Sequence, residues 1–413
     1  MRTTTRTASM LLGAVLTASL TACASTVAGT AVPGEIAIST LDVGAYPTEP
    51  PNAHDDDPVP DFYEMYKLAA MRIADYTISS GDIDPQMMYG NSADFANPRL
   101  LPDELGNEDV MSGIAERHQM LYGFHSRGAS QDFTPDIVGD SWPTKKASNR
   151  LTATTMVFQF PDPERAGAAA REFHDADLAA QDGAEAVRLP KYPEVSAHWR
   201  PDSPFLRTLM PHGPFVIGFQ LSVATPDLTA LTTMAETAYG KQIAALDKAT
   251  PLTDEQVMTL PWDPDHLLMR TLNPDQLTAP NSGYTYVTGR QGFQHFAGGT
   301  IPDNRRYLGE QLTAMNAEQV AVAWGSIGIR TPDAETARRA VTEKLFLWPT
   351  EADAAPPPNL TDSACVENKR FEAEKRYSCI LAYKEYVGIV SSEQLLDAQQ
   401  RAAAQYAVFA NSR

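Results

Sequence analysis

The feature that most constrains the fold is a pattern of elements that occurs twice along the chain. In the first copy, a β-rich run at 151–160 precedes an alanine-rich helical segment at 164–180, a hairpin at 205–223 and a helix at 228–246. In the second copy, the apolar run 320–329 precedes a helix at 334–346, a hairpin at 376–390 and a closing helix from 395. Each copy therefore predicts the order strand, helix, hairpin, helix.

Capping residues mark where the helices of both copies begin. Asp162 stands before Pro163, and Asp333 stands in the same relation to its helix, so each aspartate is expected to cap a helix N-terminus. Ser391 with Gln394 predicts a capping box for the closing helix. The two copies indicate an internal duplication. The alternative is ordinary α+β alternation in two stretches that share capping chemistry.

Hairpins inside each copy require antiparallel pairing, so the sequence predicts an α+β fold of two similar units with antiparallel sheets and helices against one sheet face. The 413 residues suffice for two domains. We place a signal peptide at 1–22, a proline-rich tether at 23–60, an N-terminal α+β domain at 61–250 and a C-terminal α+β domain at 251–413.

Weaker patterns lie outside the two copies. Residues 61–80 have apolar side chains at spacings of three and four, which predicts a helix, and 110–124 is a second helix candidate. Residues 81–107 are rich in Pro, Asn and Asp and are expected to be irregular. Within the tether, 36–43 has the composition of one edge strand.

The amino terminus has the pattern of an export signal. Arg2 and Arg6 precede an apolar run at 10–20, which as a helix spans about 16 Å and is too short to cross a bilayer. Residues 20–23 (LTAC) follow at once and resemble the lipobox of bacterial lipoproteins. This resemblance implies cleavage before Cys23 and transfer of diacylglycerol to its sulfur. Two acyl chains would anchor the chain stably, with the tether lifting the folded part off the membrane.

The two other cysteines, Cys365 and Cys379, lie fourteen positions apart. In an exported chain this even pair predicts one structural disulfide in the C-terminal domain. A redox-active pair is disfavoured because the Cys-x-x-Cys spacing is absent, and two unpaired thiols are the remaining alternative.

Charge and motif content exclude several functions. The formal net charge of −19 disfavours nucleic acid as a partner. No metal-ligand spacing occurs among the eight histidines, and the run at 54–57 (HDDD) lies in the tether, where a solvated charge run is expected. We therefore predict no cofactor and no metal site.

No catalytic motif is present either. Ser326 follows Gly325, but Trp324 stands where a nucleophile elbow has its first glycine. Lys241 follows a glycine without the rest of a phosphate-binding loop. We name no catalytic residue. The aromatic residues that could line an apolar groove are Trp199, Trp262, Trp324, Tyr284 and Tyr286. The alternative is that they pack in the hydrophobic core, which is more common for such residues.

Four stretches together resemble a known family. They are the lipobox, residues 26–34 (TVAGTAVPG), residues 41–48 (LDVGAYPT) and residues 397–406 (DAQQRAAAQY). The chain is similar over its whole length to actinobacterial envelope lipoproteins of mycobacterial and nocardial type, whose mature region is known only as domains of unknown function. The resemblance implies a location on the extracytoplasmic face of the cell membrane, and it implies no catalytic residue.

Two functions follow as expectations. The first is a non-catalytic binding or interaction module of the envelope, whose partner is a lipid, glycan, small molecule or protein. The second is an envelope hydrolase with a site assembled between the two halves. Because ligands commonly bind at such junctions, the connecting stretch 251–283 with Trp262 is where we expect the site.

Overall fold

The structure is a computed structural model that describes residues 35–50, 62–131, 150–273, 284–297, 304–347, 351–369 and 375–412. The chain divides into two units, Met1–Ala37 and Ile38–Arg413. Both sheets and all named helices belong to the second unit.

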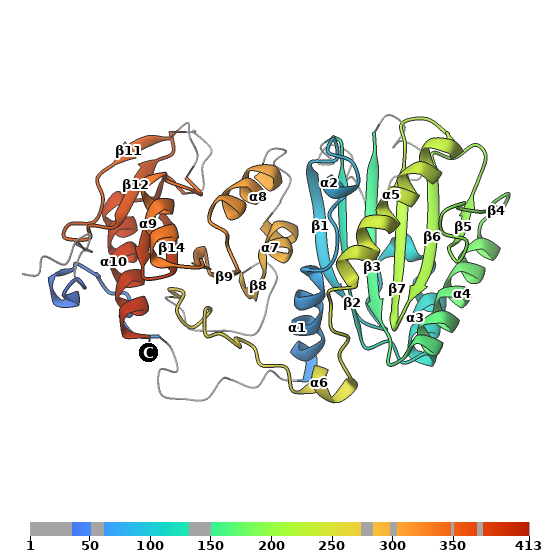
Figure 1. Ribbon diagram of the computed structural model, residues 1–413, viewed down its shortest axis with the longest axis horizontal. Coiled ribbons are helices and arrows are strands. Elements are labelled where there is room, and N and C mark those ends of the chain that lie inside the picture. Colours follow the sequence, from blue (N-terminus) through green and yellow to red (C-terminus); the bar gives the residue numbers. More distant parts are fainter. Residues whose placement is uncertain are drawn as a thin grey trace, which may run out of the picture. The chain divides into compact units, whose positions relative to one another are not determined.

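The first sheet has seven strands within the described residues, in the order β1-β2-β3-β7-β6-β5-β4, and all neighbours are antiparallel (Figure 1). The strands are β1 (Tyr89–Ala96), β2 (Tyr122–Ala129), β3 (Thr152–Gln159), β4 (Glu185–Val187), β5 (Ser196–Trp199), β6 (Phe205–His212) and β7 (Phe215–Ser222). The accompanying helices are α1 (Phe62–Ala74), α2 (Ser80–Ile83), η2 (Asp103–Leu105), α3 (Glu108–Arg117), α4 (Pro163–Ala180), α5 (Leu228–Leu246) and α6 (Asp254–Met258).

The second sheet also has seven strands among the described residues, in the order β11-β12-β13-β14-β10-β9-β8, again antiparallel throughout. They are β8 (Thr285–Thr288), β9 (Gln319–Ala323), β10 (Ser326–Arg330), β11 (Ala352–Ala354), β12 (Ser363–Glu367), β13 (Tyr377–Tyr383) and β14 (Tyr386–Ser392). The helices are α7 (Arg290–Ala297), α8 (Asn304–Ala314), α9 (Ala334–Thr342) and α10 (Leu395–Asn411).

The two sheets have one topology. When β8 is matched to β1, β9 to β2 and so on to β14 and β7, the spatial orders are identical. The strand β3 leads into α4 as β10 leads into α9, and β7 leads into α5 as β14 leads into α10. The predicted α+β class with two similar antiparallel units is confirmed, and the repeated unit is larger than the four elements expected.

The predicted caps and hairpins explain much of this regularity. Asp162 accepts a hydrogen bond from the Arg165 amide (2.8 Å), and Asp333 caps α9 in the same way. Each central hairpin turns through two residues, which begin with Gly213 (φ +55°) in one half and Lys384 (φ +50°) in the other. A left-handed residue at this position matches the right-handed twist of the paired strands.

Helices cover both faces of the first sheet, and the expectation of one covered face is wrong for it. Phe158 packs against Phe173 of α4, with ring centroids 6.4 Å apart. Phe219 packs against Tyr239 of α5 at 4.9 Å. Phe158 is the cross-strand partner of Val216, so these two side chains lie on the same face of the sheet. Phe219 is three positions after Val216, and because side chains alternate along a strand, it lies on the opposite face. This explains why β3 and β7 are buried along their whole length.

A buried glutamine holds the start of the first repeat in place. Gln242 of α5 accepts a hydrogen bond from the Ile78 amide (3.0 Å) and donates one to the Tyr76 carbonyl (2.7 Å). Its side chain is fully buried. Next to it, the Thr77 hydroxyl donates to the carbonyl of Ile73 (2.9 Å). The segment that follows α1 is thus bound to the last helix of its repeat.

The second repeat makes the same contacts with different residues. Gln405 of α10 accepts from the Leu272 amide (2.7 Å) and donates to the Arg270 carbonyl (2.7 Å), and it too is fully buried. The Thr271 hydroxyl donates to the carbonyl of Leu267 (2.8 Å). Equivalent bonds at equivalent places support duplication over shared capping chemistry, and they extend the second repeat back to about residue 267.

Several local predictions are wrong. The run 320–329 is a hairpin, β9 and β10, around Trp324 (φ +46°) and Gly325 (φ +88°), because that pair forms a two-residue turn. The helix expected at 110–124 ends at Arg117 as α3, and its last residues begin β2. The irregular stretch 81–107 contains β1, and 36–43 contains a short 3-10 helix, η1 (Ile38–Thr40), in place of a strand.

The capping box expected for α10 does not form. Ser391 instead shares a hydrogen bond with Ser378 on the adjacent strand, with 2.9 Å between their oxygens. Gln394 is the N-cap residue and makes no side-chain capping bond. Strand β14 extends to Ser392, and Ser391 therefore belongs to the sheet ladder.

Part of the expected tether is folded against the C-terminal half. The Tyr46 hydroxyl donates to Asp397 of α10 (2.6 Å), and the Arg401 guanidinium lies 5.0 Å from the Tyr46 ring centroid. The Asn411 side chain donates to the Thr48 carbonyl (2.7 Å). Residues 38–50 are therefore part of the folded unit, whereas 23–34 and 51–60 lie outside the described residues.

Candidate functional site

A cleft of about 320 Å³ lies where the first repeat meets the second. Its wall includes α1, the stretch 249–264 and strand β8, with single residues from β2 and β9. The lining residues are Leu68, Met71, Arg72, Ile73, Asp75, Tyr76, Tyr122, Ala249, Thr250, Leu252, Trp262, Pro264, Val287, Thr288, Gly289 and Gln319. Part of the predicted stretch 251–283, including Trp262, thus lies in the cleft wall, and the volume falls in the range of small-molecule sites.

Helix α1 positions most of one wall. It contacts β1 and β2 of the first sheet as well as α7 and β8 of the second half. Leu68, Met71 and Ile73 are all buried because the helix is covered from more than one side. The cleft is therefore built on a helix fixed by both repeats, which gives it a preformed shape.

Asp75, just past the end of α1, joins the two repeats. Its carboxylate accepts hydrogen bonds from the amides of Gly289 (2.6 Å) and Gly292 (2.7 Å), and from the Thr288 hydroxyl (3.3 Å). A Cβ at Gly289 would lie 2.7 Å from these oxygens, so only glycine allows the approach. Burial raises the pKa of Asp75, and the three donors oppose that effect.

Arg72 contributes a cation to the same wall. One of its terminal nitrogens donates to the Pro261 carbonyl (2.6 Å). Burial lowers the pKa of Arg72, as expected for a charge that is partly removed from water. The sequence did not single out Arg72 and Asp75, because both lie in the ordinary amphipathic pattern of 61–80. Only the fold brings α1 and the residue that follows it to 249–264.

Among the described residues that line the cleft there is no Ser, Cys or His and only one carboxylate. That carboxylate already accepts three hydrogen bonds, so it is poorly placed to act as a base for Thr288. Apart from Arg72, Asp75 and the neutral polar residues Thr250, Thr288 and Gln319, that lining is apolar or aromatic. This composition fits binding better than hydrolysis.

A serine–histidine contact does occur between the repeats, but outside this lining. Ser126 Oγ lies 2.9 Å from His295 Nδ1, and His295 Nε2 lies 2.7 Å from the Thr77 carbonyl. Because a carbonyl oxygen can only accept, Nε2 donates a hydrogen bond to it, and in the neutral imidazole Nδ1 accepts one from the Ser126 hydroxyl. Both side chains are buried, at 2% and 3% exposure. The His295 ring packs edge-on against Phe124, with ring centroids 5.1 Å apart, so the pair contributes to the packed contact between the repeats.

A second polar cluster lies under α4 in the first repeat. Asp177 bonds Arg207 (2.7 Å) and lies 3.1 Å from His198 Nε2. Although burial alone would raise it, the pKa of Asp177 is lowered by these two partners. The adjoining cavity, about 10 Å³, has room for about one water molecule. The His174 ring lies against that of His198 at a tilt of 60°, with ring centroids 5.3 Å apart.

The other aromatic candidates lie elsewhere. The Trp199 indole donates to the Ser203 carbonyl (2.8 Å), and Tyr286 is buried against Phe296. Tyr284 and Trp324 stack on each other at the surface, with centroids 4.8 Å apart. Among the five aromatic candidates, the cleft lining includes Trp262 alone.

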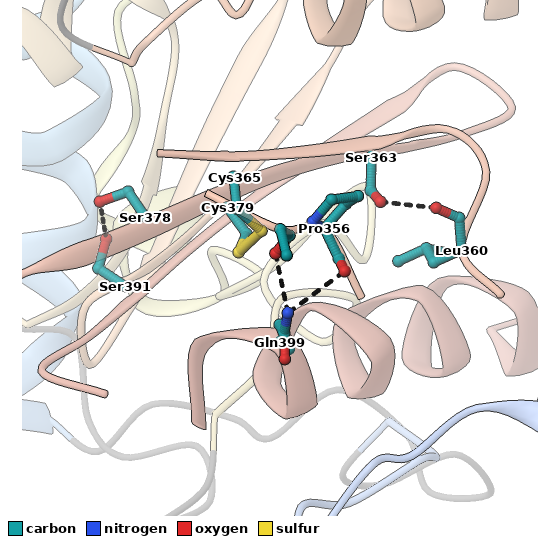
Figure 2. The surroundings of a disulfide bond; sticks show 9 residues. Pro356, Leu360, Ser363, Cys365, Ser378, Cys379, Ser391 and Gln399 are labelled. Atoms are coloured by element: carbon teal, nitrogen blue, oxygen red, sulfur yellow. Dashed lines mark hydrogen bonds between the residues drawn. A yellow bond between two sulfur atoms is a disulfide. The ribbon is translucent and has the colours of Figure 1, made fainter. Parts of the chain in front are cut away.

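The predicted disulfide is confirmed. Cys365 on β12 and Cys379 on β13 are direct cross-strand partners and are bonded to each other (Figure 2). Both are buried. The Gln399 side chain of α10 donates to the Pro356 carbonyl nearby (3.3 Å), as Figure 2 shows. The bond therefore fixes the strand that follows the proline segment to the central hairpin.

Two features named from the sequence, the lipidation site and the acidic run of the tether, lie outside the described residues. Cys23 belongs to 1–34, and the run 54–57 belongs to 51–61. Within the described ranges, no group of three or more metal-ligating side chains is close enough to hold an ion. In the same ranges, no helix has the length and apolar character needed to cross a bilayer.

Comparison with known protein families identifies the family to which the chain belongs. Residues 56–262 match the N-terminal domain of unknown function DUF7373, and 267–412 match its C-terminal domain. The chain therefore belongs to the DUF7373 family. The predicted membership in a family of domains of unknown function is confirmed.

One solved structure with similarity is the extracellular domain of PknH from Mycobacterium tuberculosis. The match covers 46% of this chain and 98% of that domain, at 11% sequence identity and a TM-score of 0.30. No curated protein matches the chain in sequence.

Proposed function

We propose that this chain is a lipid-anchored extracytoplasmic protein of the cell envelope that binds a small ligand, without turnover, in the cleft between its two repeats. The cleft carries the proposal: it is preformed, mostly apolar and lined by residues of both halves. The disulfide supports export, because such bonds persist in oxidising compartments.

The rival is a hydrolase that uses Ser126 and His295. Their contact is the observation in its favour, but both side chains are buried away from the cleft lining. A catalytic serine must contact both its base and the substrate. Ser126 contacts His295, but it is buried and does not line the cleft, so a substrate in the cleft cannot reach it.

The anchor gives the first prediction. Mass spectrometry of the mature amino-terminal peptide is expected to show diacylglyceryl-modified Cys23. Cys23→Ala should leave the chain unprocessed at this step or release it from washed membranes, because two acyl chains are what make the association stable. Recovery of an unmodified mature terminus at another residue would contradict the anchor.

The second prediction tests the cleft with the indole N–H signals of the five tryptophans. Titrating ¹⁵N-labelled protein with a solvent extract of its own envelope should move the Trp262 signal and leave Trp324 unchanged. Ala249→Phe, which fills the cleft, should abolish the shift. Lys248→Phe is the matched control, since Lys248 is exposed and outside the lining.

Two outcomes would count against the binding function. A shift confined to Trp324 would place the ligand on the surface stack. Consumption of an extract component that stops in Ser126→Ala would favour the hydrolase, provided that the variant keeps the wild-type thermal midpoint.

A further inference from the structure

We propose that the ligand of this cleft is a small amphiphilic carboxylate, with an anionic head bound by Arg72 and a short apolar body packed against Trp262 and its neighbours. This inference rests on the proposed binding function and adds the chemistry of the ligand.

The cleft's volume sets the ligand's size. An internal cavity of about 150 Å³ holds one benzene molecule, and this cleft of about 320 Å³ has about twice that volume. A molecule of about twelve non-hydrogen atoms, such as decanoate, is therefore the expected scale. A membrane phospholipid with two long chains is too large to be enclosed.

The apolar part of the wall suits an alkyl or aryl body. Leu68, Met71 and Trp262 are each buried to at least nine-tenths, yet they line the cleft. Burying apolar surface against them would contribute about 25 cal/mol for each Å² removed from water. This term favours a hydrophobic body over a sugar or a free inorganic anion.

The charge in the wall suits an anionic head. Among the described residues Arg72 forms no ion pair, and its one hydrogen bond runs to a neutral carbonyl, that of Pro261. A partly buried guanidinium is costly unless it is paired. Because guanidinium presents a fork of donors that matches a carboxylate, a carboxylate head is the natural partner.

Two described carboxylates are associated with this wall, Asp75 in the lining and Asp265 through its electrostatic effect on Arg72, and both are already engaged. Asp75 accepts from the Gly289 and Gly292 amides, at the N-terminus of α7. Asp265, which acts electrostatically on Arg72, pairs with Arg330 at 3.5 Å and accepts from Gln319. Neither is left to neutralise Arg72 directly, and the head of a ligand can do so.

Isothermal titration with three ten-carbon probes tests the inference. Decanoate should bind the full chain saturably and one to one, whereas decanol and decylammonium should bind at least about tenfold more weakly. Arg72→Gln should weaken decanoate about tenfold or more and leave decanol unchanged, and Arg72→Lys should restore part of the loss. Arg99→Gln is the matched control, since the Arg99 side chain is 86% exposed and outside the lining.

The outcomes separate this inference from the function beneath it. If decanoate and decanol bind equally and Ala249→Phe blocks both, the carboxylate head is wrong and the binding cleft stands. If none of the probes binds while the envelope extract still moves the Trp262 signal, the inference is overturned on size or chemistry. Thermal midpoints equal to wild type show that Arg72→Gln remains folded.

Discussion

Gln405→Ala is expected to lower the free energy of unfolding by about 3 kcal/mol. The fully buried Gln405 side chain acts as a clamp on the segment before β8, and the substitution removes its hydrogen bonds to the Leu272 amide and the Arg270 carbonyl. Each buried polar group left without a partner costs about 1–3 kcal/mol. Urea denaturation followed by circular dichroism measures the change.

The repeat supplies a matched test of that result. Gln242→Ala should cost about as much as Gln405→Ala, because its clamp on Ile78 and Tyr76 is equivalent. Gln394→Ala is the control on the same helix as Gln405: its side chain is exposed, makes no capping bond and should change stability by less than about 0.5 kcal/mol. If Gln405→Ala lowered the free energy of unfolding by as little as Gln394→Ala does, the buried glutamines would not contribute to stability.

Removal of the disulfide is the second large effect. The double variant Cys365→Ser with Cys379→Ser should lose about 3 kcal/mol, since the bond closes a loop of about 15 residues. Reduction of the wild-type protein should produce a similar loss and should leave the double variant unchanged. Non-reducing peptide mapping should recover the two cysteine peptides linked, and free thiols in protein harvested from the envelope would contradict the bond.

Features that depend on neighbours in sequence were predictable. Asp162 and Asp333 cap helices because a short polar side chain beside a helix start can bond the first free amides. The hairpins around Gly213 and Lys384 were visible because apolar strands flank short polar turns. The cysteine pair followed from its even count in an exported chain.

Features that depend on distant partners were not predictable. Strand β1 contains Asn91 and Asp94 and has a loop-like composition, and it is a strand because β2 pairs with it. The Gln242 clamp joins residues 164 positions apart, which no local pattern records. In the cleft, Trp262 lay in the predicted stretch, whereas Arg72 reaches it only through the packing of α1 between the repeats.

Native mass spectrometry of the protein released from its own membranes is the sharpest test of a binding cleft between the repeats. We expect one small ligand, about the size of the cleft, bound one to one to the wild type and to Lys248→Phe, and absent from Ala249→Phe. We also expect the recovered ligand to be unchanged after incubation with the protein. A ligand retained by Ala249→Phe, or converted to a product by the wild type, would contradict a non-catalytic binding cleft between the repeats.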